Sequence, residues 1–453
     1  MADDRVQDLL GLDREVARAD VALRRWRSAL AADPEAHASD DPLHDIRRVA
    51  RKSMWDALGE LPPGGADAPL RDALRRWVVW LLLARISLVD DVAWARAAAA
   101  PLGEVADERP RLVSWREAWR GVVLATTPAR ARLSLRAAAD AAPHLAEAAR
   151  ARAARRVEVA RRMGLGHPWE AVAPAAPSEL RAAAARLLDA TEDLSRAVWK
   201  EALGRDLDAA AVLHGAVSRE AGEGWPTRIS ARWLEEIFGV GTHGLPIDLP
   251  ALPQAAGAAS FARALEAFGF ALRVAVIPTS MPFSLAREPA SVQAHSVGFL
   301  FGALAADREF YTRALGIGRR AASAQARVLA RAALLEARLN AARLLLGDEG
   351  AFAPLDLFDE MGPRLFGSPL DGRLRGAWPA ARDDEPARLI ALLETRALQE
   401  SMRERFDTDW FRNPRAWTYL RAQEVPPARQ RIERGLLETS ADDLARAFEK
   451  ALG

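Results

Sequence analysis

The spacing of apolar residues is the strongest constraint on this chain. Apolar residues recur three and four positions apart along nearly the whole sequence, and the helix-forming residues alanine, leucine, arginine and glutamate dominate it. Alternating apolar and polar residues, which would predict strands, are nearly absent. Residues 272–278, LRVAVIP, are the only β-rich fragment of note. The pattern predicts an all-α protein with at most a very small β element.

Three segments predict long helices. Residues 72–99 carry the helical pattern without interruption and predict one largely buried helix. Residues 127–164 predict one or two helices, with Pro143 as a kink or break because proline lacks an amide hydrogen. Residues 322–348 predict a third long helix, which we expect to end at Gly347.

Composition excludes several classes of protein. The chain has 453 residues and no cysteine, so disulfides, thiolate metal sites and cysteine nucleophiles are excluded. Its 63 basic and 62 acidic residues are interspersed, so we expect no nucleic-acid partner. The charged N-terminus does not resemble a secretory signal, and the apolar run 77–84 is too short to span a membrane. We therefore expect a soluble, cytoplasmic, bacterial protein without a membrane partner.

Proline and glycine mark the candidate boundaries. The stretch 164–179 is the best boundary, which predicts an N-terminal helical region, 1–165, and a C-terminal helical region, 178–453. Residues 239–260 and 366–386 predict two further irregular segments. A long loop such as 239–260 often packs over a cleft or carries function.

One octet, LEAFGFAL (265–272), has the outline of a zinc-peptidase helix. In such helices two histidines four residues apart face zinc, and a glutamate beside the first acts as general base on the zinc-bound water. Residues 261–311 resemble the active-site block of the helical gluzincin peptidases, the group of oligoendopeptidases, thimet oligopeptidase and angiotensin-converting enzyme. Residues 406–422 resemble the end of that group's chain, so the resemblance covers 262–453 in patches.

The resemblance implies a fold and a set of site positions. We expect a large zincin-like helical body with a central channel, a motif helix at 262–272 and a third-ligand helix at 289–306. The first and second zinc histidines correspond to Glu266 and Phe270. The general base corresponds to Ala267, and the third-ligand glutamate to His295. A catalytic zinc site has three protein ligands and a water, whereas Glu266 and His295 supply at most two.

These replacements predict a degenerate site with no catalytic residue and no bound metal, so zinc is disfavoured as a cofactor. Glu266 and His295 are expected to face each other, either as a buried ion pair in the metal position or as a weakened metal or acid–base site. His243, Trp225 and Trp233 are candidates for residues that line a cleft, although His243 also suits a solvent-facing loop.

The sequence therefore favours a catalytically inactive, metallopeptidase-like protein, a pseudopeptidase that binds a peptide or protein partner in a helical channel. It could also form a homo-oligomer, or a hetero-oligomer with a related peptidase. One alternative is an active metallopeptidase or other hydrolase with a rearranged site around Glu266 and His295. The other is a helical scaffold that never carried such a site.

Overall fold

The structure is a computed structural model that describes residues 8–106, 109–204, 207–217, 222–249, 252, 257–346, 355–379, 382–422, 432–433 and 435–453. Helices form nearly all of its regular structure, which confirms the predicted all-α class. In the described part of the chain the only strands are β1 (Gly103–Val105) and β2 (Arg111–Val113), paired as an antiparallel hairpin. No described helix is long and apolar enough to cross a membrane.

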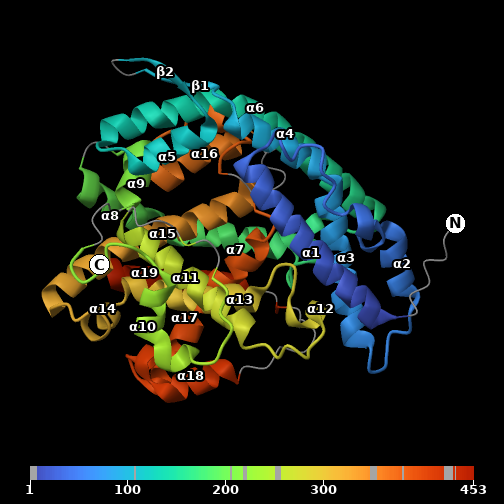
Figure 1. Cartoon of the computed structure of the whole chain (residues 1–453). Coiled ribbons are helices and arrows are strands. Elements are labelled where there is room, and N and C mark those ends of the chain that lie inside the picture. Colours follow the sequence, from blue (N-terminus) through green and yellow to red (C-terminus); the bar gives the residue numbers. More distant parts are fainter. Residues whose placement is uncertain are drawn as a thin grey trace.

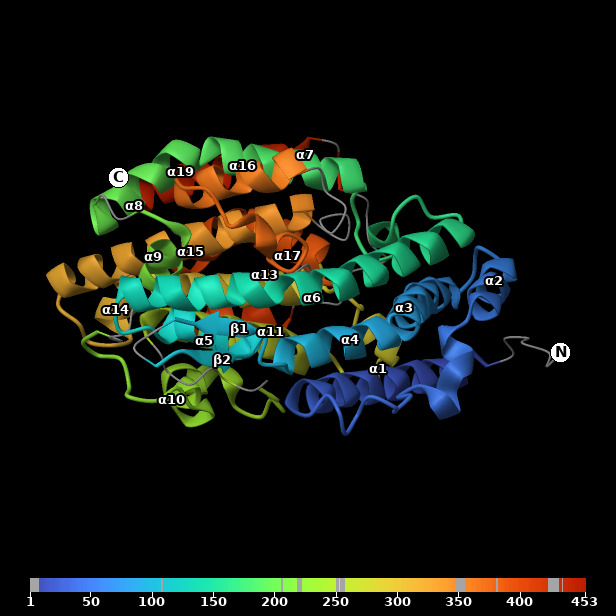
Figure 2. The same cartoon turned by 90° about the horizontal axis from the view of Figure 1, so that it is seen from above.

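The N-terminal helices form one end of the molecule (Figure 2). They are α1 (Leu9–Ala32), η1 (His44–Ala50), α2 (Lys52–Glu60), α3 (Ala68–Ile86) and α4 (Leu88–Ala99). Their apolar faces enclose a separate hydrophobic cluster that includes Trp26 and Trp77. After α5 (Trp115–Leu124), the long helix α6 (Pro128–Arg162) crosses the molecule and ends beside these N-terminal helices (Figures 1 and 2).

The remaining helices build the larger, C-terminal part. They are η2 (Pro168–Ala171), α7 (Pro177–Ala190), α8 (Glu192–Leu203), α9 (Ala209–Ala216), α10 (Ala231–Thr242), α11 (Ala258–Ala275), α12 (Phe283–Ala286), α13 (Val292–Gly302), η3 (Ala303–Ala306), α14 (Arg308–Arg313), α15 (Arg319–Leu346), α16 (Leu355–Phe366), η4 (Gly372–Leu374), α17 (Glu385–Phe406), η5 (Trp410–Arg412), α18 (Pro414–Arg421) and α19 (Leu436–Leu452). One hydrophobic cluster joins Leu145 of α6 to Leu180 of α7 and Leu389 of α17, so buried packing extends across the predicted boundary at 164–179.

Two local predictions differ from the structure. Residues 72–99 form two helices, α3 and α4, because the chain turns at Ser87, whose hydroxyl donates to the carbonyl oxygen of Leu83 at 2.8 Å. The apolar spacing continues through this turn, so periodicity alone could not reveal it. The β-rich fragment 272–278 begins inside α11, where packing overrides its strand propensity.

The other two long helices are present, but the helix break considered at Pro143 is absent. Helix α6 continues through Pro143, whose ring lies on the exposed face while Ala142 and Leu145 beside it are buried. Helix α15 covers most of 322–348, and Gly347 lies outside the described residues.

Helices α11 and α13 pack directly against each other through glycines. A Cβ atom on Gly269 would lie 2.4 Å from the carbonyl oxygen of Val297. A Cβ atom on Gly298 would lie 3.0 Å from the carbonyl oxygen of Glu266. Only glycine leaves room for so close a backbone approach, which fixes the register between the two helices.

We predict that Gly269→Ala lowers the free energy of unfolding by about 2 kcal/mol or more, because its methyl group overlaps backbone that cannot easily move. Urea denaturation measures the change. The matched control is Gly239→Ala in α10, where an added Cβ meets no heavy atom within 4 Å. That control should be neutral or slightly stabilising through helix propensity. Equal effects of the two variants would contradict the close approach of α11 and α13.

Candidate functional site

The structure brings two of the predicted site positions into contact. Glu266 and Phe270 lie one turn apart on α11, and His295 lies in the first turns of α13. The rings of Phe270 and His295 pack with centroids 5.1 Å apart. His295 is buried, at 7% exposure, whereas Glu266, Ala267 and Phe270 are half-buried. The glycine contact between α11 and α13 sets this arrangement.

Helix α17 provides the ion-pair partners of both polar residues. Nη2 of Arg388 lies 2.9 Å from Oε1 of Glu266, and its guanidinium lies 5.2 Å from the ring centre of Phe299. His295 Nε2 lies 3.0 Å from Oδ2 of Asp384. Glu266 and His295 are therefore each paired with α17, and the expected direct pair between them is replaced by two separate pairs.

The charges around these pairs reinforce one another. Burial lowers the pKa of Arg388, but the carboxylates of Glu266, Asp384 and Glu385 outweigh it and leave the pKa raised. Burial raises the pKa of Asp384, but the hydrogen bond and charge of His295 outweigh it and leave the pKa lowered. Arg388 and Asp384 are thus held in their charged forms, which favours their contacts with Glu266 and His295.

Asp384 belongs to an acidic triplet, Asp383, Asp384 and Glu385, at the beginning of α17. Negative side chains are favourable there because they interact with the positive end of the helix dipole. Asp383 accepts from Arg152 at 2.5 Å, from Arg156 at 2.6 Å and from Arg27 at 3.3 Å.

Glu385, the last residue of the triplet, pairs with Arg343 of α15 at 3.2 Å. The same guanidinium donates to Glu336 at 3.0 Å and to Asn340 at 2.6 Å. Asp383 therefore connects the start of α17 to α1 and α6, Asp384 connects it to α13, and Glu385 connects it to α15.

Sequence reasoning missed the triplet and its partners. The start of α17 carries a local signal, since acidic residues followed by proline in the first turn are typical of a helix N-terminus. The arginine partners of Asp383 lie more than 200 positions away in the sequence, and no local pattern connects them.

We predict that Asp383→Asn lowers the free energy of unfolding at neutral pH by about 3 kcal/mol or more, because it removes a buried negative charge that three guanidiniums share. Two of them, Arg27 and Arg152, keep their pairs with Asp91. Three guanidiniums outweigh burial and hold the pKa of Asp383 well below its usual range. The stabilisation is therefore complete above the pKa of the unfolded chain, near 4, and is lost as the pH falls through the lower folded value.

Denaturation of the wild type and the variant at several pH values tests this prediction. The difference between them should shrink as the pH is lowered below about 4. Asp193→Asn is the control, because Asp193 is fully exposed and lies 3.5 Å from Arg196. A variant of Asp383 as stable as this control would contradict the prediction.

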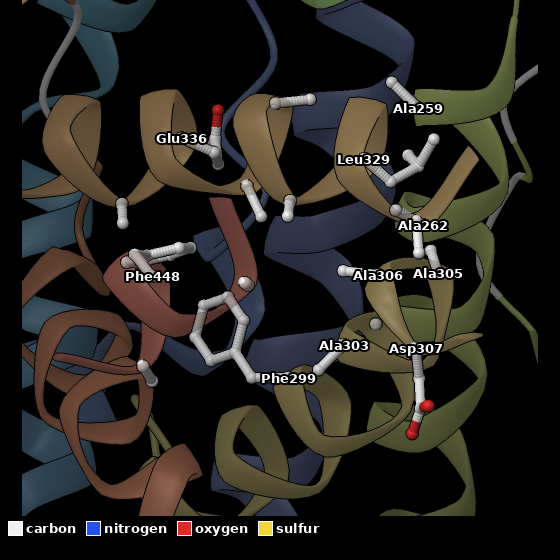
Figure 3. A pocket seen from close by; sticks show the side chains of 18 of the residues that line it. Ala259, Ala262, Phe299, Ala303, Ala305, Ala306, Asp307, Leu329, Glu336 and Phe448 are labelled. Atoms are coloured by element: carbon white, nitrogen blue, oxygen red, sulfur yellow. The ribbon is translucent and has the colours of Figure 1, made fainter. Parts of the chain in front are cut away.

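A cavity of about 750 Å³, the first cavity, lies beside the Glu266–Arg388 pair. It is bounded by α11, α13, α15, α17 and α19. Small side chains form much of its wall, among them Ala259, Ala262, Ala303, Ala306, Ala330 and Ala333. In Figure 3 the rings of Phe299 and Phe448 lie on the side of α15 that also faces Ala303 and Ala306. The volume falls in the range typical of ligand pockets.

Charged and polar groups are spaced along this wall. Glu266 and Glu336 contribute carboxylates, and Arg263 contributes a guanidinium. Burial raises the pKa of Glu336, but Arg343, Arg263 and other arginines outweigh it and leave the pKa lowered. The first cavity therefore offers charges of both signs among small, aliphatic and aromatic side chains. Phe270 and His295 are not among its described lining residues, and Phe270 lines a second cavity further along α11.

The three candidate cleft residues lie apart from both cavities. Trp225 is buried, stacks on Phe261 with ring centroids 4.3 Å apart and donates to Gln325 at 3.0 Å. Trp233 is half-buried and packs against Trp225 and Phe261. His243 is exposed where α10 ends, and its carbonyl oxygen accepts from Arg421 at 2.9 Å. In the described structure the two tryptophans serve as core residues.

No group of three or more histidine, aspartate or glutamate side chains within the described ranges is arranged to hold a metal ion. No protein-family profile, no curated protein and no solved structure matches this chain. Function must therefore be argued from the site itself.

We predict that Glu266 and Arg388 are energetically coupled. A double-mutant cycle with Glu266→Gln and Arg388→Met should give a coupling energy of about 1–3 kcal/mol, because either single change leaves a partly buried charge without its partner. Chemical denaturation of the wild type, both single variants and the double variant measures it. Additive effects would show that the pair does not contribute to stability.

Proposed function

We propose that this chain is a noncatalytic relative of the helical gluzincin peptidases that binds an extended peptide, or a peptide segment of a partner protein, in the first cavity. The main support for the proposal is that side chains from the beginning of α17 pair with both polar residues of the degenerate site. The resemblance implies three zinc-ligand positions, and two of them are Glu266 and His295. In the structure Glu266 is paired with Arg388, and His295 is paired with Asp384.

Arg388 disfavours a catalytic metal on electrostatic grounds. A guanidinium remains protonated at all ordinary pH values, so it places a permanent positive charge 2.9 Å from Glu266. A divalent cation bound by the same carboxylate would be repelled by that charge. The general-base position holds Ala267, which has no group to accept a proton from water.

The wall of the first cavity suits a peptide backbone. Ala326, Ala330, Ala333 and Ala337 line it from α15 at helical spacing, so a backbone can approach this stripe between the larger lining residues Leu329, Glu336 and Leu339 of the same helix. An extended peptide must satisfy its amide and carbonyl groups. Gln399 and Ser323 bring polar side chains to the same cavity. Charges of both signs nearby could select among peptide sequences.

We predict that the wild-type protein retains peptides from a digest of a denatured carrier protein, and that Ala333→Trp reduces retention at least about tenfold by filling the first cavity. The matched control is Ala324→Trp, which places the same side chain at an exposed position of α15 outside the cavity wall. Retention on the immobilised protein is measured by mass spectrometry. Equal retention by both variants, or none by the wild type, would overturn the assignment of the first cavity.

The noncatalytic part of the proposal has its own test. Purified protein is expected to contain less than stoichiometric zinc and to leave the same peptides uncut. Stoichiometric zinc that a chelator removes, together with peptide cleavage, would refute it. Cleavage that disappears in His295→Ala would instead favour an active hydrolase with a rearranged site.

A further inference from the structure

The second cavity has a volume of about 710 Å³ and lies between the two ends of the molecule. Helices α1 and α3 form one side, and the C-terminal part of α11, the segment 285–294 and α17 form the other. Aromatic and aliphatic side chains provide much of the wall, including Trp77, Trp80, Phe270 and Ile277. The peptide-binding proposal makes no use of this space.

Its charged wall residues are predominantly basic. Five arginines and three acids line the second cavity, a formal excess of two positive charges. The arginines are Arg24, Arg27, Arg76, Arg273 and Arg287, and the acids are Asp20, Glu288 and Glu394. Burial raises the pKa of Asp20 despite the nearby arginines, and burial also raises the pKa of Glu394.

Arg76 has a hydrogen-bond donor that is free for a ligand. Arg24 is already paired with Asp20, and Arg27 with Asp383. Arg76 is half-buried on α3, and its Nε is a buried donor without a hydrogen-bond partner in the described structure. A buried donor that stays unsatisfied is unfavourable, so a ligand that accepts from it gains stability.

A second guanidinium adds to the positive potential of this wall. Arg273 is only 4% exposed and donates to Gln293 at 2.8 Å. Burial lowers the pKa of Arg273, and the carboxylate of Glu288 opposes that effect. A negative group placed in the second cavity would further favour the charged form of this guanidinium.

We propose that the second cavity binds a small organic anion with an apolar body, of the aryl or alkyl carboxylate class. The carboxylate would accept a hydrogen bond from Arg76, and the apolar body would pack against Trp77, Trp80 and Phe270. Charge-assisted hydrogen bonds in a partly buried site give the anion its advantage over a neutral molecule of the same shape.

The probe for this proposal is 2-naphthoate, with neutral 2-naphthalenemethanol as the matched ligand. Isothermal titration calorimetry on the full chain should show one 2-naphthoate site and at least about tenfold weaker binding of the alcohol. Arg76→Met should weaken 2-naphthoate binding about tenfold. Arg75→Met is the control, since Arg75 stacks over Trp55 and does not line the cavity.

Two further comparisons locate the probe. Glu394→Gln should tighten 2-naphthoate binding because it removes a negative charge from the wall, and unchanged or weaker binding would count against the proposal. Ile277→Trp should block the second cavity, whereas Ala333→Trp, in the first cavity, should leave the affinity unchanged. The proposal would be overturned if Ala333→Trp blocked 2-naphthoate binding and Ile277→Trp did not. Equal binding of 2-naphthoate and the alcohol would also overturn it. Peptide retention is measured separately, so either proposal can fail alone.

Discussion

The acidic triplet at the start of α17 is the interaction on which the arrangement of this molecule depends. Asp383 binds arginines of α1 and α6, Asp384 binds His295 of α13, and Glu385 binds Arg343 of α15. Buried carboxylates and guanidiniums are costly unless each is paired. The N-terminal helices, the motif helices and the central helix α15 are therefore all positioned relative to one short stretch of chain.

Glycine packing between α11 and α13 supplies the second requirement of the site. Their close approach at Gly269 and Gly298 brings Phe270 and His295 together and leaves Glu266 facing the first cavity. Arg388 of α17 then pairs with Glu266. The geometry of the site thus follows from one apolar contact, which sets the register, and one polar network, which sets the charges.

Sequence reasoning recovers what is encoded locally. The spacing of apolar residues predicts the all-α class. The resemblance remains a prediction: Phe270 and His295 touch, but Glu266 and Phe270 line different cavities. The apolar spacing does not predict the turn at Ser87, because the apolar pattern continues through that turn without a break.

Long-range pairing is where sequence reasoning fails. Arg388 and Asp384 become partners of the site residues only through the folding of α17 onto α11 and α13, and nothing near them in the sequence indicates this. Trp225 appears beside an irregular segment in the sequence, yet it is a core residue because Phe261 and Gln325 surround it in space.

The cations of the network have a chemical consequence. All but Lys52, Lys200 and Lys450 of the 63 basic residues are arginines, and the buried pairs described above use arginine or histidine. Arginine keeps its proton in strongly alkaline solution, whereas lysine loses it near pH 10. Amine-reactive reagents would therefore leave these buried pairs intact. Among the lysines, Lys450 lines the first cavity, so a label there would change the charge of that cavity, whereas Lys52 and Lys200 lie outside its wall.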